Sequence, residues 1–227
     1  ITPKLVKGEL DIAAVPANLA SVLYNNTQGK VKVLAVNTLG VLYIVENGDT
    51  VKSVEDLRGR TIFASGKGAT PEYALNYLLS ANGIDPEKDV TLEYKSEHSE
   101  CLAALLANEG SVAMLPQPFV TTAQLKQPEV KVVLDMNEEW AKLQEGSETP
   151  SALITGVLVG RTEFIDQNQQ AVSDFLDAYA QSVAFANENA EEPAALIGQY
   201  DIITEEVAKV ALPQCAIVYI DGAEMTQ

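Results

Sequence analysis

The sequence is poor in the side chains on which metal sites and nucleophilic catalysis depend. Its 227 residues include one histidine, His98, and two cysteines, Cys101 and Cys215. One imidazole and two thiols that are distant in the sequence cannot supply a metal site of the usual ligand spacing. Both cysteines lie in apolar surroundings, so we interpret them as small buried side chains rather than as a disulfide. The composition therefore predicts no metal, no cofactor and no catalytic residues.

Basic residues and long apolar runs are also scarce. Fifteen Lys and Arg residues face 32 Asp and Glu residues, which gives a net charge of −17. Such a chain repels phosphate backbones, so we expect no nucleic-acid partner. No Lys/Arg run would hold the chain to anionic lipid, and no apolar stretch approaches the length that crosses a bilayer. The sequence opens at Ile1-Thr2-Pro3 without a signal-peptide pattern, and we expect a fragment or a processed chain.

What the chain does contain is an alternation of short apolar runs and amphipathic stretches, which is typical of an α/β protein. We predict strands over residues 11–15, 31–36, 41–45, 60–64, 90–94, 112–115 and 130–134. Helices are predicted over residues 71–82, 100–108 and 168–187, where apolar residues recur at helical spacing. The pattern favours mostly parallel strands with helices packed around them.

A weak internal repeat suggests two similarly built halves. Residues 5–16 (LVKGELDIAAVP) align with residues 105–116 (LLANEGSVAMLP) at an offset of one hundred residues. Each copy reads as a helix end, a turn, a strand and a proline, followed by another helix. Ligands of open α/β sheets bind outside the carboxyl ends of the strands. Two facing lobes would therefore bring Pro16-Ala17-Asn18 to one wall of a cleft, and Pro116-Gln117-Pro118 to the other.

Two glycine-containing strands bracket the middle of the chain and are candidates for a hinge. Residues 38–45 (TLGVLYIV) and 151–159 (SALITGVLV) each carry a glycine within a β-rich run, at Gly40 and Gly156. Strands that pass between lobes let a few backbone angles absorb domain closure. A pair of ordinary core strands is the alternative, and the sequence does not separate the two.

The segment ASGKGATP, residues 64–71, is the main candidate for ligand contact. It runs from a strand into a helix, and its two glycines let the backbone approach a ligand closely. The helix N-terminus accepts anions, Lys67 adds a charge, and the hydroxyls of Ser65 and Thr70 can donate. The spacing is not that of a Walker loop. The alternative is a plain connecting loop in which Thr70 caps the helix and Pro71 follows.

Two further groups of residues are candidates for parts of a site. His98 lies near the predicted cleft, but no acidic pattern orients it, and Ser99 is better explained as a helix cap than as a nucleophile. Tyr43, Tyr73 and Trp140 can stack on a ring, but each is more simply interpreted as core or rim.

Several motifs together resemble one family. Residues 5–13 (LVKGELDIA) are similar to its G-x-x-D-hydrophobic segment, and residues 56–62 (DLRGRTI) to its D-L-x-G-K-x-I. Residues 83–90 (GIDPEKDV) match its G-I-x-P-x-x-D-V turn, and residues 155–159 (TGVLV) before Phe164-Ile165 resemble its return into the first lobe. The chain thus resembles the nitrate/sulfonate/taurine-type solute-binding proteins of ABC importers, which include thiamine-precursor binders.

The resemblance implies a type II periplasmic-binding-protein fold, with lobe 1 formed by residues 1–42 and 156–227 and lobe 2 by residues 43–155. It implies capture of a small solute by hinge closure, delivery to an ABC permease, and an extracytoplasmic monomer whose membrane contact is a lipid anchor. An enzyme of the same fold or the effector domain of a transcription regulator are the alternatives. The resemblance, with the candidates above, gives one expected set of ligand-binding residues: Pro16, Ala17, Gly40, Ser65, Gly66, Lys67, Gly68, Ala69, Thr70, His98, Gln117, Pro118, Thr155 and Gly156. The absence of arginine from this set argues against a strongly anionic ligand.

Overall fold

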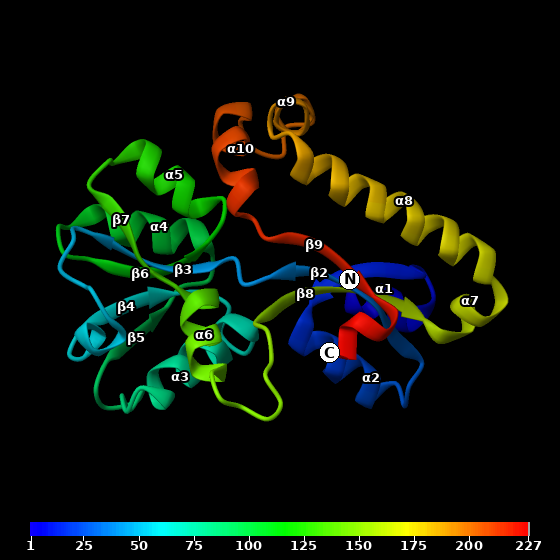
Figure 1. Cartoon of the computed structure of the whole chain (residues 1–227), viewed down its shortest axis with the longest axis horizontal. Helices are drawn as coiled ribbons and strands as arrows, with labels where there is room; N and C mark the ends of the chain where they lie inside the picture. Colours follow the sequence, from blue (N-terminus) through cyan, green and yellow to red (C-terminus); the bar gives the residue numbers. More distant parts are fainter. Residues whose placement is uncertain (227) are drawn as a thin grey trace.

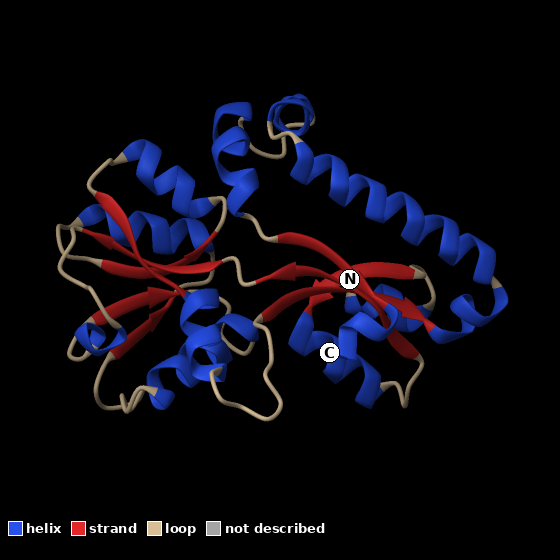
Figure 2. Ribbon diagram, in the orientation of Figure 1, coloured by secondary structure: helices blue, strands red, loops and turns tan. Residues whose placement is uncertain are grey.

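The computed structural model describes residues 1–226, and for Thr226 the backbone alone. Two β-sheets lie side by side, each with its own helices (Figure 1), and extended segments of chain connect them (Figure 2). Within the described residues, no helix is both long enough and apolar enough to cross a membrane. The predicted α/β class is confirmed, and every predicted strand and helix overlaps an observed one.

The first lobe is built on a four-stranded sheet in the order β1-β8-β2-β9. Its strands are β1 (Ile12–Pro16), β2 (Val31–Leu39), β8 (Ile154–Arg161) and β9 (Ile217–Asp221). Its helices are α1 (Thr2–Lys7), α2 (Ala17–Asn26), α7 (Thr162–Gln167) and the long α8 (Gln169–Glu188). Leu5, Leu23 and Val159 are buried in its core. Residues of β1, β2 and β8 share this core with residues of α1 and α2.

The expectation of mostly parallel strands is wrong for this sheet. All three pairings, β1 with β8, β2 with β8 and β2 with β9, are antiparallel. The reason is that β8 returns from the second lobe and inserts between β1 and β2. Two strands that run the same way are thereby separated by one that runs against them.

The second lobe is built on a five-stranded sheet in the order β5-β4-β6-β3-β7. The strands are β3 (Leu42–Asn47), β4 (Thr61–Ala64), β5 (Thr91–Tyr94), β6 (Val112–Pro116) and β7 (Val130–Asp135). Strands β4, β5 and β6 are parallel, and β3 runs antiparallel to β6 and β7. Strands β4 to β7 therefore end at the sheet edge where β3 enters from the first lobe.

Both faces of this second sheet are covered by helices. The 3-10 turn η1 (Val54–Leu57), α3 (Thr70–Ala81) and α6 (Met136–Gln144) share one buried cluster with the sheet, in which Ile44 and Ile62 are fully buried. The helices α4 (His98–Ala107) and α5 (Phe119–Lys126) pack with Val45 and Leu115 in a second cluster. Of these helices, α6 was not predicted from the sequence.

The internal repeat corresponds to the same local structure in both lobes. Strand β1 ends at Pro16 and α2 follows at once, while β6 ends at Pro116 and α5 begins at Phe119. Each proline lies opposite the strand that arrives from the other lobe, with Pro16 paired to Gly156 and Pro116 to Leu42. The two copies thus frame the place where the chain crosses between lobes.

A helical segment near the C-terminus spans the two lobes. It consists of α9 (Glu191–Gln199), α10 (Glu205–Ala211) and the 3-10 turn η2 (Leu212–Gln214). Helix α10 contacts α5 of the second lobe, and β9 then returns the chain to the first sheet before η3 (Gly222–Thr226). Figure 1 shows this segment above the junction of the lobes, at the end of α8. Neither this bridge nor β9 was predicted.

Candidate functional site

Three segments of chain cross between the lobes at one place. Strand β2 leads into β3 through Gly40, β8 starts just after Leu153, and Ala216 precedes β9. Hydrogen bonds join the crossings, since the Gly40 amide donates to the Leu153 carbonyl (2.7 Å) and the Leu39 amide to that of Ala216 (3.1 Å). Two of the crossings were predicted as hinge candidates, whereas the third, at Ala216, was not.

The first crossing has an unusual backbone. Gly40 has φ +58°, and Val41 has φ +65°, a conformation that a β-branched residue adopts at a cost of roughly 1–2 kcal/mol. A Cβ on Gly40 would lie 2.7 Å from Cβ of Asn137. Both the positive φ and the close approach of Asn137 therefore favour glycine at position 40. Local strain of this kind often accompanies a segment that moves.

The second crossing is closely packed against the first. A Cβ on Gly156 would lie 2.5 Å from Oδ1 of Asn37 and 2.9 Å from Oγ1 of Thr38. The Thr155 hydroxyl donates to the Thr38 carbonyl (3.4 Å). Thr155 and Gly156 are thus placed within the hinge, and their contacts are with the neighbouring strand.

Beside the hinge is a cavity of about 480 Å³ whose walls come from both lobes. We call it the inter-lobe pocket. A larger cavity of about 850 Å³ lies within the first lobe, around Lys7, Lys30 and Arg161, and touches no residue of the second lobe. The inter-lobe pocket is of the size that small ligands occupy. It is lined by Ala17, Asn18, Ser21, Thr70, Tyr73, Ala74, Tyr77, Trp140, Ala152, Leu153 and Ile154.

Three aromatic rings form the second-lobe wall of this pocket. Tyr73 and Tyr77 are one helical turn apart on α3, and Trp140 lies on α6. The rings of Tyr77 and Trp140 are 4.7 Å apart between centroids and tilted by 47°. The indole N–H of Trp140 donates to the Ser151 carbonyl (3.0 Å). Tyr73 and Trp140, interpreted as core or rim from the sequence, are therefore pocket residues, and Tyr77 was missed.

The two lobes touch directly at one edge of the pocket. The Thr70 hydroxyl donates to Oδ1 of Asn18 (3.1 Å), and Nδ2 of Asn18 donates to the Gly68 carbonyl (3.3 Å). The first turn of α2 in the first lobe thereby meets the first turn of α3 in the second. The expectation that Thr70 caps α3 is wrong, because α3 begins at Thr70 after Ala69 and has no side-chain cap.

The loop before α3 differs from the expected anion site. The Gly68 amide donates to a carboxylate oxygen of Glu72 (2.5 Å), so a negative charge of the protein itself lies at the start of this helix. The Lys67 ammonium lies over the Tyr94 ring, 5.8 Å from its centroid. Gly66 and Gly68 have φ +76°, as their place in a tight turn requires, and the amide of Ala69 donates to the Gly66 carbonyl (3.0 Å). The Gly68 amide and Lys67 thus have partners within the protein, and the predicted contact of this loop with a ligand stays a prediction.

Ser65 and His98 meet on the α4 side of the second lobe. The Ser65 hydroxyl is hydrogen-bonded to Nδ1 of His98, and the imidazole packs on the Phe119 ring at 5.2 Å between centroids. Burial lowers the pKa of His98 below its usual value, against the opposing charge of Glu97. Burial likewise raises the pKa of the neighbouring Cys101 thiol. Both shifts favour neutral side chains, which is the behaviour of a packed polar cluster.

Helix α4 also differs in detail from its expected start. It begins at His98 after Glu97, so Ser99 lies inside the first turn and the expected Ser99 cap is wrong. Neither Ser65 nor His98 lines the inter-lobe pocket.

Gln117 and Pro118 follow β6, and Gln117 contacts Gln214 of the C-terminal helical segment. The Gln117 carboxamide accepts from the Thr121 hydroxyl (3.0 Å) and donates to Oε1 of Gln214 (2.9 Å). The Tyr43 hydroxyl also donates to the Gln214 carbonyl (2.9 Å). These contacts tie β3 and β6 to η2, and they place Gln117 behind the hinge and outside the inter-lobe pocket.

Of the expected binding residues, Ala17 and Thr70 line the inter-lobe pocket. Pro16 is exposed at the end of β1, next to Ala17. Pocket residues that the sequence reasoning missed lie on the same helices, at Ser21, Ala74 and Tyr77, and at the second crossing, residues 152–154. The signal that could have found those on α3 is the aromatic pair at spacing i, i+4 on the face of α3 opposite its buried leucines. Within residues 1–226, no group of three or more His, Cys, Asp or Glu side chains is placed to hold a metal ion.

A family model described as ABC transporter, phosphonate, periplasmic substrate-binding protein matches residues 2–203. No curated protein sequence gives a significant match.

Solved structures of similar fold are found among binding proteins of ABC transporters. An ABC transporter protein from Parabacteroides distasonis is 23% identical with a TM-score of 0.77, and the match covers 98% of this chain and 72% of that one. The periplasmic aliphatic sulphonate binding protein SsuA from Escherichia coli is 16% identical with a TM-score of 0.78, and the match covers 98% and 68%. The alkanesulfonate-binding protein SsuA from Xanthomonas axonopodis pv. citri, bound to MOPS, is 15% identical with a TM-score of 0.68, and the match covers 96% and 71%. At these identities the likeness shows the fold, and it confirms the predicted two-lobed periplasmic-binding-protein architecture.

Proposed function

We propose, from the premise that the chain belongs to the family of periplasmic substrate-binding proteins of phosphonate ABC transporters, that its inter-lobe pocket captures a small solute and that lobe closure presents this solute to an ABC permease. Proteins of this family work outside the cytoplasm as solute-binding partners of a permease, and they are not enzymes. The observation that carries the proposal is a pocket with walls from both lobes, next to a three-segment hinge.

Closure would follow from the two-sided construction of the pocket. A solute that touches α2 on one side and α3 and α6 on the other interacts with both walls only when the lobes are together. Binding therefore shifts the population toward the closed state. The units that we propose to move are residues 1–42 with 156–227 against residues 43–155, with rotation absorbed at Gly40 and Val41, at Thr155 and Gly156, and at Ala216.

We assign different roles to the expected binding residues. Ala17 and Thr70 contact the solute, supported by their place in the pocket, and Pro16 positions the start of α2. Gly66, Lys67, Gly68 and Ala69 shape the loop that brings Thr70 to Asn18. Ser65, His98, Gln117 and Pro118 support the second lobe behind the hinge. On the family premise, the protein acts as a monomer whose attachment to the membrane is a lipid anchor.

Ligand-induced stabilisation tests solute capture. A library of sulfonates, phosphonates, sugars, amino acids and nitrogen heterocycles is screened by thermal shift. A solute that binds only the folded state, at a free concentration 100 times its Kd, stabilises that state by about 2.7 kcal/mol. Ser21→Phe, on the exposed side of α2, should fill the pocket and abolish the shift without lowering the Tm of the unliganded protein. Ser173→Phe, on exposed α8 outside the pocket, is the matched control. The proposal fails if no solute raises the Tm, or if Ser21→Phe binds as tightly as the native protein.

A further inference from the structure

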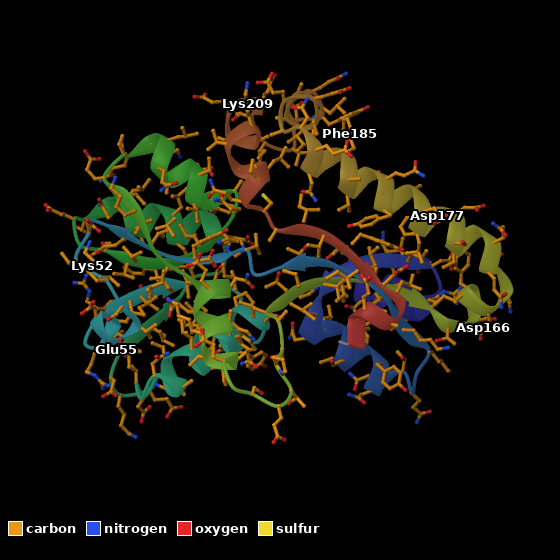
Figure 3. All side chains as sticks on the ribbon, in the orientation of Figure 1. Lys52, Glu55, Asp166, Asp177, Phe185 and Lys209 are labelled. Carbon is orange, nitrogen blue, oxygen red and sulfur yellow. The ribbon has the colours of Figure 1, made fainter. Side chains whose placement is uncertain are left out.

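Among the residues that the structure describes, those lining the inter-lobe pocket include three aromatic rings and no charged side chain. Its polar groups are the amide of Asn18 and the hydroxyls of Ser21, Thr70 and the tyrosines, and the rest is apolar. Charged side chains cover the outer surface instead: Figure 3 shows Lys52 and Glu55 at the far end of the second lobe and Asp166 at the far end of the first. A chain with 47 acidic and basic residues thus leaves its inter-lobe pocket uncharged.

Two of the three rings, those of Trp140 and Tyr77, are held in place before any ligand arrives. The Trp140 N–H is bonded to the Ser151 carbonyl (3.0 Å), and the Gln144 side chain donates to the Tyr77 hydroxyl (3.4 Å). The loop that follows α6 therefore holds Trp140, and the last residue of α6 holds Tyr77, each by the polar edge of its ring. Tyr73 is 57% exposed and Tyr77 41%. Preorganised ring faces bind a flat apolar surface with little loss of conformational entropy.

The same site offers little to an oxoanion. A sulfonate or phosphonate that leaves water needs cationic side chains or free helix amides to replace its hydration. Here the carboxylate of Glu72, in the first turn of α3, accepts from the Gly68 amide just before the helix, so an added anion would meet a like charge. The nearest basic residue in this loop, Lys67, lies over the Tyr94 ring and outside the pocket lining.

We infer that the solute carries a planar ring and is uncharged or cationic, rather than a sulfonate or phosphonate. The ring stacks against Tyr73, Tyr77 and Trp140, and its polar atoms bond to Asn18 and Thr70. The faces of aromatic rings also attract cations, so a positive charge on the ring is tolerated where a negative charge is not. This inference rests on the proposed function, because it names the ligand class of the same site.

The protein's single tryptophan makes the inference directly measurable. Trp140 lines the pocket, so its fluorescence reports occupancy without a label. Three panels are titrated, with calorimetry as a second readout: pyrimidine, purine and pyridine bases; N-methylpyridinium and its N-methylated analogues; and ethanesulfonate, methylphosphonate and inorganic phosphate. We expect saturable changes with members of the first two panels and none with the third.

Paired variants connect this response to the aromatic wall. Tyr73→Ala removes one exposed ring and should weaken binding of the ring solute about tenfold. Tyr200→Ala, a tyrosine 72% exposed and absent from the pocket lining, should leave Kd unchanged. Ser21→Lys places a cation at the pocket and should create measurable ethanesulfonate binding that the native protein lacks.

The outcomes separate the two proposals. If ethanesulfonate or methylphosphonate binds the native protein and ring solutes do not, the inference is overturned while solute capture stands. Absence of any response to all three panels also overturns the inference, and in that case the thermal-shift screen decides solute capture independently. Equal affinities of Tyr73→Ala and the native protein for a ring solute would likewise refute the stacking role.

Discussion

At the scale of single residues, the environment of a side chain decides its chemistry more than its type does. His98 is the protein's one imidazole, and a free imidazole near a cleft would be a candidate base. Its bond to Ser65, its contact with Phe119 and its burial instead favour the neutral form. Glu72 shows the same principle, because its carboxylate accepts from the Gly68 amide and places a negative charge beside the start of α3.

The lowered pKa of His98 predicts a contribution to acid sensitivity. The unfolded chain binds a proton at the ordinary histidine pKa of about 6.5, whereas the folded state does so only at lower pH. The contribution of His98 to the free energy of unfolding is therefore fully present above about pH 6.5, and it is lost as the pH falls toward the pKa of His98 in the folded state. Because His98 is the only histidine, its proton NMR titration is unambiguous and should give a pKa below 6.5.

The control for this prediction is His98→Asn, which has no group that titrates in this range. Between pH 7 and the folded pKa of His98, the free energy of unfolding should fall less steeply with decreasing pH in His98→Asn than in the native protein. A native NMR pKa at or above 6.5, or parallel stability curves, would contradict the account.

At the scale of elements, apolar periodicity predicted most of the secondary structure, and contacts between distant segments account for the errors. The run at residues 112–115 is a buried strand and the run at 31–36 is a partly buried one. Pro71 near the start and Gly83 just past the end correctly bound α3. By contrast, β9 has a partly exposed burial pattern and is held by its pairing with β2. The antiparallel insertion of β8 is likewise a tertiary feature, since its sequence reads like that of any buried strand.

The hinge element yields a prediction that separates backbone strain from crowding. Gly40→Ala meets both, because φ is +58° and the new Cβ would lie 2.7 Å from Cβ of Asn137. Gly83→Ala is the matched control, with φ +73° and no atom within 4 Å of its Cβ. We expect Gly83→Ala to cost about 1 kcal/mol in unfolding free energy and Gly40→Ala about 1–3 kcal/mol more, as measured by urea denaturation. Equal losses of unfolding free energy in the two variants would show that Asn137 moves aside without cost and that crowding contributes nothing at position 40.

At the scale of the whole molecule, the family assignment confirms the predicted class, a binding protein of an ABC importer and not an enzyme. The repeat at residues 5–16 and 105–116 was enough to suggest two similar lobes, because each copy encodes a whole helix-strand-helix unit. The pocket was less predictable, since it forms where α2, α3 and α6 meet across 123 residues of sequence, from Ala17 to Trp140. Tyr77 and Trp140 become neighbours only through the packing of α3 on α6.

The direct contact between lobes makes closure itself measurable. Asn18 is the first-lobe side of this contact, bonded to the Thr70 hydroxyl at 3.1 Å and to the Gly68 carbonyl at 3.3 Å. Each such bond contributes roughly 0.5–1.5 kcal/mol, so Asn18→Ala should raise the open-to-closed ratio of the ligand-free protein about fivefold or more. Small-angle X-ray scattering should then give a larger radius of gyration for Asn18→Ala than for Asn25→Ala, an exposed asparagine further along α2. Affinity is the wrong readout, because Asn18 also lines the pocket, whereas the lobe separation of the ligand-free protein responds to the contact without any effect on ligand binding. Identical scattering from the two variants would mean that the hinge segments, and not the Asn18 contact, hold the lobes together.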